Sequence, residues 1–70
     1  MPITLAEKDK ELTITRIGGS QEIKQHLADL GFVVGGTVKV ISSIDGNLIV
    51  SVKGVRIALS TEMARKIMVA

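Results

Sequence analysis

The sequence predicts a mainly β domain: a small barrel of five short strands, with one α-helix between the first and second strands and a short helical turn before the last strand. Two patterns predict this architecture. Apolar and polar residues alternate in several short runs, as in strands that bury one face, and only residues 20–36 show helical spacing. The 46% hydrophobic content is almost wholly Ile, Val, Leu and Ala, which favours strands. At 70 residues the chain is expected to form one domain, 1–70.

The predicted helix has a clear start signal. Ser20 is suited to be the N-cap, because its hydroxyl can accept a hydrogen bond from a free amide of the first turn, where Glu22 adds a favourable negative charge. Apolar residues then recur at i, i+4 and i+7 on one face of the helix: Ile23, Leu27 and Leu30.

The same helix has a clear stop signal. Gly31 is expected at C′ in a left-handed conformation, which a Cβ would strain. Phe32 is then C″ and Leu27 is C3, the pair whose apolar contact accompanies this kind of stop. Phe32, Val33 and Val34 lie between the helix end and two glycines. These three residues must either fill the core or face a partner.

The segment before the helix contains a turn and a strand. The T-x-x-E spacing of residues 4–7 predicts a short helical turn stabilised by a capping box. Residues 12–17 alternate, which places Leu12 and Ile14 inward in the first strand. Two glycines at 18–19 then separate this strand from the helix.

A meander of three strands is expected after the helix. Residues 45–46 and 53–54 read Asp-Gly and Lys-Gly, and Asp-Gly in particular signals a tight hairpin turn. In the last strand of the meander, Val55, Ile57 and Leu59 share the inward side. The predicted strands after the helix, including a short closing strand, are residues 37–41, 48–52, 55–59 and 67–69.

Closure of the sheet decides the predicted fold. Ser60 is expected to cap a short helical turn that leads into the last strand. An open meander of this size would leave two exposed edges and an uncovered apolar face, whereas closure pairs the first and last strands around one core. The predicted architecture is therefore an SH3-like barrel.

One motif identifies a family resemblance. Residues 27–40 read L-x-x-L-G-F-x-x-G-x-x-V-x-V, and with residues 52–54 and 57–59 the chain resembles the FeoA family, ferrous iron transport protein A, over nearly its whole length. The resemblance implies a small cytoplasmic SH3-like protein that works with the membrane transporter FeoB and its GTPase domain. It also implies a likeness to the C-terminal domain of iron-dependent repressors. The chain departs from the family at Val34, where proline is common, and in its short loop at residues 42–47.

Composition excludes several classes of function. Without cysteine there is no disulfide framework, thiolate zinc site or thiol chemistry, and no nucleophile motif accompanies the single histidine, so neither an enzyme nor a cofactor is expected. Gly18-Gly19-Ser20 lacks phosphate-loop spacing and is expected to be a structural turn. Nucleic-acid binding is not expected, because the chain has no Tyr or Trp for stacking. Direct membrane insertion is not expected either, because no apolar run is long enough.

Three helix residues are weak candidates for a metal site. Glu22, His26 and Asp29 recur at i, i+4 and i+7 beside the apolar stripe, so their side chains could approach one divalent ion. The sequence pattern offers no fourth ligand and no further residues that would orient these three side chains by hydrogen bonds. Solvated charge on a helix face is the favoured interpretation.

Partner contact is expected at the helix end. The other apolar residues suffice for a core of this size, so at least one of Phe32, Val33 and Val34 is expected to be exposed, with Val34 first. Lys53 and Arg56 would form a charged flank if their hairpin lies close to this loop.

The favoured function is a cytoplasmic protein-interaction module that acts on an FeoB-type membrane GTPase transporter. The alternative is a metal-sensing or metal-delivery protein. A repressor-derived domain is less favoured, because the chain begins at Met1 and is expected to be complete. The sequence leaves open the oligomeric state and whether a partner is activated, inhibited or assembled.

Overall fold

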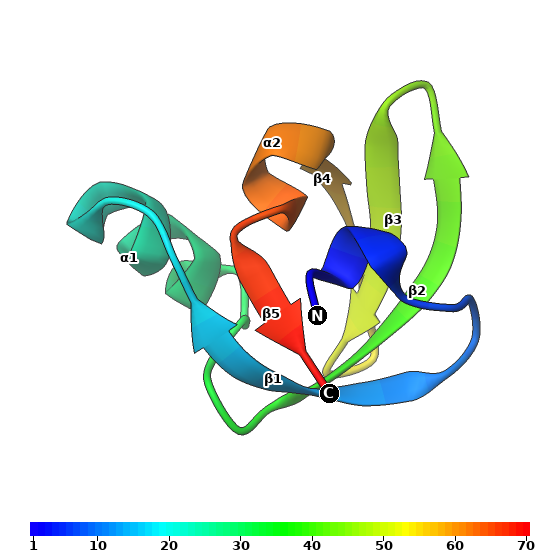
Figure 1. Ribbon diagram of the computed structural model, residues 1–70, viewed down its shortest axis with the longest axis horizontal. Coiled ribbons are helices and arrows are strands. Elements are labelled where there is room, and N and C mark those ends of the chain that lie inside the picture. Colours follow the sequence, from blue (N-terminus) through cyan, green and yellow to red (C-terminus); the bar gives the residue numbers. More distant parts are fainter.

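The computed structural model describes all 70 residues as five strands and three short helical segments around one core (Figure 1). The elements in chain order are η1 (Ile3–Leu5), β1 (Glu11–Ile17), α1 (Gln21–Asp29), β2 (Thr37–Ile44), β3 (Asn47–Val52), β4 (Val55–Ser60), α2 (Thr61–Ala64) and β5 (Ile67–Val69). The predicted number, type and order of the strands and of the helix are confirmed.

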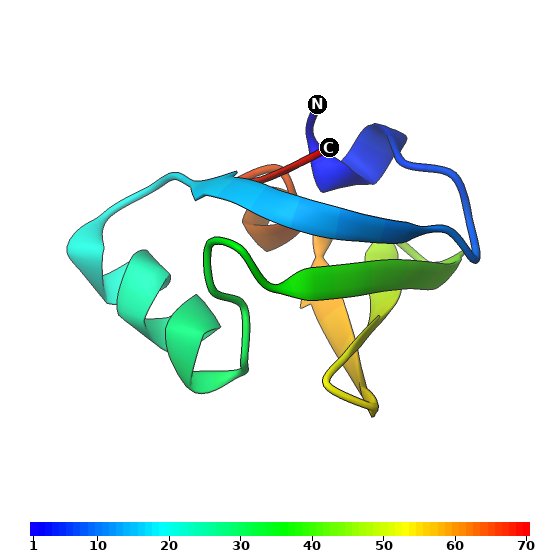
Figure 2. The same ribbon diagram turned by 90° about the horizontal axis from the view of Figure 1, so that it is seen from below.

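All five strands form one antiparallel sheet in the order β4-β3-β2-β1-β5. The sheet is strongly bent, and β1 pairs with β2 through its first half and with β5 through its second half (Figures 1 and 2). This confirms the SH3-like barrel and the predicted pairing of the first and last strands. The two end strands, β4 and β5, are not hydrogen-bonded to each other. The chain connects them through α2, which packs on β3, β4 and η1.

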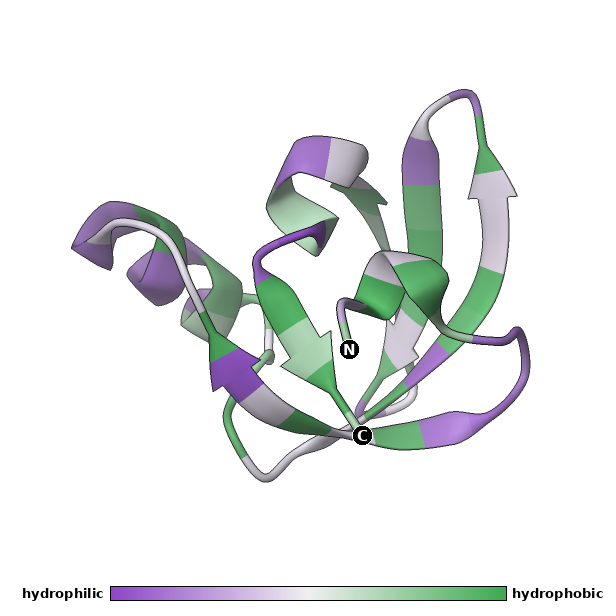
Figure 3. Cartoon of the chain, viewed as in Figure 1, coloured by the Kyte–Doolittle hydropathy of each residue, from purple (hydrophilic) through white to green (hydrophobic).

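The core lies inside the bend of the sheet and draws on every element of the fold. Strand residues supply most of it, and η1, α1, the loop after α1 and α2 each add one side chain. Figure 3 shows the contrast between the largely hydrophilic α1 and the apolar residues of the strands. The buried residues are Ile3, Leu12, Ile14, Leu27, Phe32, Val38, Val40, Leu48, Val50, Val52, Leu59, Ala64, Ile67 and Val69.

The tight turn predicted at Asp45 and Gly46 is confirmed, but the strands of the β2–β3 hairpin are longer than predicted. Asp45 and Gly46 alone form its turn, both with positive φ, as a two-residue type I′ turn requires. β2 continues to Ile44 because the ladder with β3 resumes beyond a bulge between Val40 and Ser42. The predicted loop over residues 42–47 is therefore wrong.

The first helical turn exists, but the predicted capping box is wrong. η1 starts at Ile3, and its N-cap residue Pro2 makes no side-chain hydrogen bond. The N-terminus instead pairs with β5: the ammonium of Met1 donates to the carbonyl oxygen of Val69 at 2.9 Å, and the Val69 amide donates to the Met1 carbonyl oxygen at 2.8 Å. This pairing sets where the turn begins and brings Ile3 into the core.

Candidate functional site

The end of α1 shapes the candidate site. Ser20 caps the start of the helix, accepting a hydrogen bond from the Ile23 amide at 3.3 Å, as predicted. At the other end, Gly31 has φ +107°, and its amide donates to the Ala28 carbonyl oxygen at 3.0 Å. The chain therefore leaves the helix at Gly31, as the sequence predicts, and turns toward the sheet.

Phe32 lies in the core, which corrects its predicted role as a partner contact. Its side chain is fully buried, because the helix stop turns it inward beside the apolar side chains that surround Leu27. A buried ring cannot meet a partner without partial unfolding. Phe32 is therefore a structural residue that holds the loop against the barrel.

Val33 and Val34 are exposed on a loop that is held in place. Val33 is 40% exposed and Val34 64% exposed, which confirms the prediction for Val34. The loop is fastened to β1: the Gly35 amide donates to the Ile14 carbonyl oxygen at 2.8 Å, and the Ile14 amide donates to the Gly36 carbonyl oxygen at 2.9 Å. The two valines are thus presented by an ordered backbone.

The β3–β4 hairpin meets this loop at Gly31. A Cβ placed on Gly31 would lie 3.7 Å from Val52 Cγ1 and 3.9 Å from Lys53 Cδ. Figure 2 shows the hairpin turn on the same side of the sheet as the end of α1. Lys53 therefore lies close to the helix end, the condition under which the sequence predicts a charged flank there.

Val55 and Arg56 lie on opposite faces of the β3–β4 hairpin, and both are exposed. Val55 pairs with buried Val52 and shares its face of the hairpin, whereas Arg56 pairs with Ser51 and lies on the opposite face. Val55 is 58% exposed, because it stands at the end of β4 beyond the reach of the core. We define the docking surface as Val33, Val34, Lys53 and Val55, which leaves Arg56 outside it. Alternation alone marked Val55 as a core residue, so the sequence held no signal of its exposure.

The three predicted metal candidates are exposed side chains of α1: Glu22, His26 and Asp29. The carboxylate of Asp29 accepts a hydrogen bond from the amide of Gln25 at 3.0 Å, a local contact along the helix. The structure gathers no group of three or more His, Asp or Glu side chains that could hold a metal ion. No helix of the chain has the length and apolar character to cross a membrane.

Known proteins are similar to this chain in sequence and in structure. The FeoA domain family model matches residues 1–70. The chain belongs to the FeoA domain family. It is 34% identical over 68 residues to a protein of Methanocaldococcus jannaschii, named provisionally as an Fe(2+) transport protein A, and the match covers 97% of this FeoA domain and 83% of the relative.

Solved structures show the same fold. The crystal structure of an iron uptake regulatory protein (FeoA) superposes with a TM-score of 0.90 at 30% identity, covering 99% of this chain and 92% of that one. The IdeR of T. acidophilum superposes with a TM-score of 0.87 at 31% identity, and there the FeoA domain corresponds to 33% of the longer chain.

Proposed function

We propose that this FeoA domain is an accessory protein of ferrous iron uptake that acts in the cytoplasm as a protein-interaction module, with no catalytic activity of its own. Its partner is an FeoB-type membrane GTPase transporter. Support for the iron-uptake role comes from the FeoA family match and from the names of the M. jannaschii relative and of the similar FeoA crystal structure.

The docking surface is the observation that carries the proposal. Monomeric proteins expose single apolar residues routinely, so one exposed valine would mean little. Here Val33 and Val34 lie on a loop tied to β1, and Val55 and Lys53 lie on the hairpin that approaches the same helix end. An ordered apolar surface with a charged edge suits a protein contact, because little conformational entropy is lost when it binds.

One substitution tests this surface directly. Val34→Asp should leave the fold and the melting temperature close to those of the unmodified chain, because the side chain is exposed. It should also abolish binding to the cytoplasmic part of the transporter, measured by isothermal titration calorimetry, because a charge would be buried in a desolvated contact.

A matched control separates a local effect from a general one. Ile44 is 56% exposed at the end of β2, and Figure 1 shows the β2–β3 hairpin turn far from α1. Ile44→Asp should bind like the unmodified chain. If Val34→Asp folds and binds normally, or if both variants lose binding equally, this surface is not the interface.

A metal titration distinguishes the interaction module from a metal-sensing or metal-delivery protein. Fe²⁺ added to ¹⁵N-labelled protein should cause no saturable shifts at Glu22, His26 and Asp29, because these exposed residues form no metal-binding group. Saturable shifts there at micromolar metal would favour the metal-handling alternative.

A further inference from the structure

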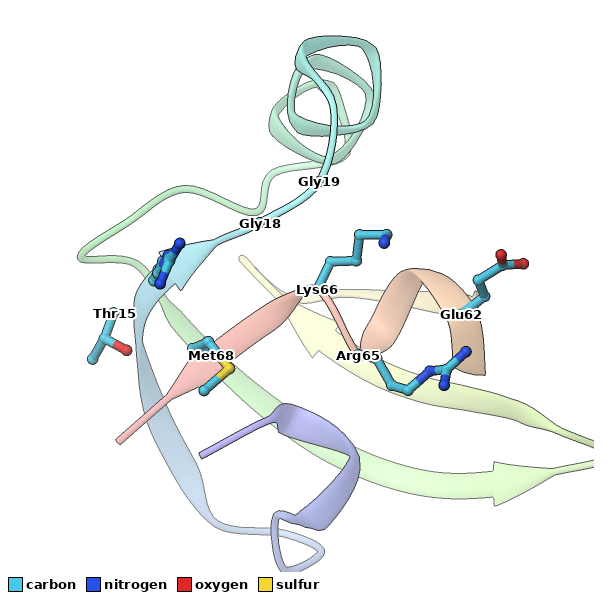
Figure 4. A pocket seen from close by; sticks show the side chains of 8 residues that line it. Thr15, Gly18, Gly19, Glu62, Arg65, Lys66 and Met68 are labelled. Carbon is cyan, nitrogen blue, oxygen red and sulfur yellow. The ribbon is translucent and has the colours of Figure 1, made fainter.

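A concave, polar groove lies between the Gly18–Gly19 loop and the junction of α2 with β5 (Figure 4). Its volume is about 670 Å³, and Met68 is its only hydrophobic lining residue. Charged side chains enter it from separate elements: Arg16 from β1, Glu62 from α2, and Arg65 and Lys66 from the segment before β5. The groove shares no residue with the docking surface.

A β-bulge aims Arg16 into this groove. Strict alternation along β1 would place Arg16 inward, after Leu12 and Ile14. The register between β1 and β5 shifts between Ile14 and Arg16, so Thr15 has no partner opposite it. As a result, two consecutive residues, Thr15 and Arg16, are both exposed and both line the groove. Bulges re-aim side chains in this way beside functional sites.

The two glycines position Lys66. The Gly18 amide donates to the Lys66 carbonyl oxygen at 2.7 Å, which fastens the loop to the start of β5. A Cβ on Gly19 would lie only 2.7 Å from Lys66 Cδ, so the aliphatic stem of Lys66 crosses directly over the Gly19 backbone. Lys66 is half-buried, and its side chain lines the groove.

The cations of the groove have no partners within the protein. None of the five hydrogen bonds made by side chains or the N-terminus involves Arg16, Arg65 or Lys66. Three cations and the single carboxylate of Glu62 line the groove, so its formal charge is +2, equal to the formal net charge of the chain. The net positive charge of the molecule is therefore concentrated at one concave site, which favours an anionic ligand.

We propose that this groove binds an acidic peptide segment of a protein partner, rich in Asp and Glu. Two guanidinium groups can each hold a carboxylate through paired hydrogen bonds, and the Lys66 ammonium adds a third contact. A lone phosphate ion fits less well, since a water molecule occupies about 30 Å³ and a small ion would leave most of the groove filled with water. A nucleic acid fits less well because the groove offers only Met68, and no aromatic ring, for stacking.

The test is a titration of the ¹⁵N-labelled full chain with a hexaglutamate peptide. Saturable shifts are expected at the amides of Thr15, Gly18, Lys66 and Met68, and binding should weaken as salt is raised, because screening reduces the attraction between exposed charges. Arg16→Gln and Arg65→Gln should each weaken binding about tenfold, as expected for loss of a charge-assisted contact. Lys10→Gln, which removes an exposed charge that does not line the groove, should change binding little.

Three results would overturn the proposal. The first is an absence of saturable shifts at low salt. The second is an equal loss of affinity in Lys10→Gln and Arg65→Gln, which would indicate nonspecific attraction by net charge. The third is tighter binding of inorganic phosphate or a single-stranded oligonucleotide than of the peptide. Val34→Asp should bind hexaglutamate normally. The proposal for this groove and the proposal for the docking surface are therefore tested independently.

Discussion

The amide of Phe32 donates a hydrogen bond to the carbonyl oxygen of Leu27 at 2.9 Å, across the left-handed residue Gly31. Together with the bond from Gly31 to the Ala28 carbonyl, this pair forms a Schellman motif in which Phe32 is C″ and Leu27 is C3. Both side chains are fully buried, so the stop that satisfies the helix carbonyls also fixes α1 to the core.

Leu27→Ala should destabilise the protein by about 2 to 5 kcal/mol, as for other buried leucines, because it opens a cavity under α1. A domain of this size is expected to have a total stability of about 4 to 10 kcal/mol, so the loss is large. Urea denaturation followed by circular dichroism measures it. A melting temperature within a degree or two of the unmodified value would mean that α1 contributes nothing to the core.

Gly31→Ala should cost about 1 kcal/mol, because an L residue is strained at φ +107°. The new Cβ would make only ordinary contacts, the nearest at 3.7 Å to Val52. Backbone strain is therefore the main cause of the expected loss of stability. Gly18→Ala is the control, since Gly18 does not have positive φ and its Cβ would also meet its nearest atom at 3.7 Å. If denaturant midpoints show the two variants to be equally stable, strain at Gly31 is not what ends the helix.

Phe32→Ala should destabilise by about 3 to 5 kcal/mol, because the ring is fully buried. Val34→Ala, two residues further on, should change stability by less than about 0.5 kcal/mol. Thermal melting of the two variants compares them. Similar small effects at both positions would contradict the assignment of Phe32 to the core and return it to the partner surface.

Ser20→Ala and Ser60→Ala should each cost about 0.5 to 2 kcal/mol, the usual range for loss of an N-cap. Each hydroxyl accepts one amide of a first turn, from Ile23 at 3.3 Å and from Met63 at 3.2 Å. Ser43→Ala is the control, because Ser43 is an exposed β2 residue whose side chain makes no hydrogen bond within the protein. Chemical denaturation should show the smallest loss of unfolding free energy for Ser43→Ala. Any other order would contradict the capping role of Ser20 or Ser60.

Local patterns determined the elements, because each depends on residues close together in the chain. Ser20 and Gly31 mark the helix ends by the hydrogen bonds and φ values that a cap and a stop require. Leu12 and Ile14 mark the buried face of β1 by alternation. Asp45 and Gly46 mark a turn, since both adopt positive φ. The family motif over residues 27–40 rests on the same local residues and led to the fold.

The tertiary structure alone decided which apolar and charged side chains reach solvent. Phe32 and Val34 are both apolar loop residues, yet one is buried and one is exposed, because only the Phe32 ring is turned into the bend of the sheet. Val55 alternates with core residues but stands past the end of the core. Arg16 follows the inward pattern of β1 and is turned outward by pairing with β5, more than 50 residues away in the chain. These outcomes depend on distant strands, whose positions no local pattern of residues records.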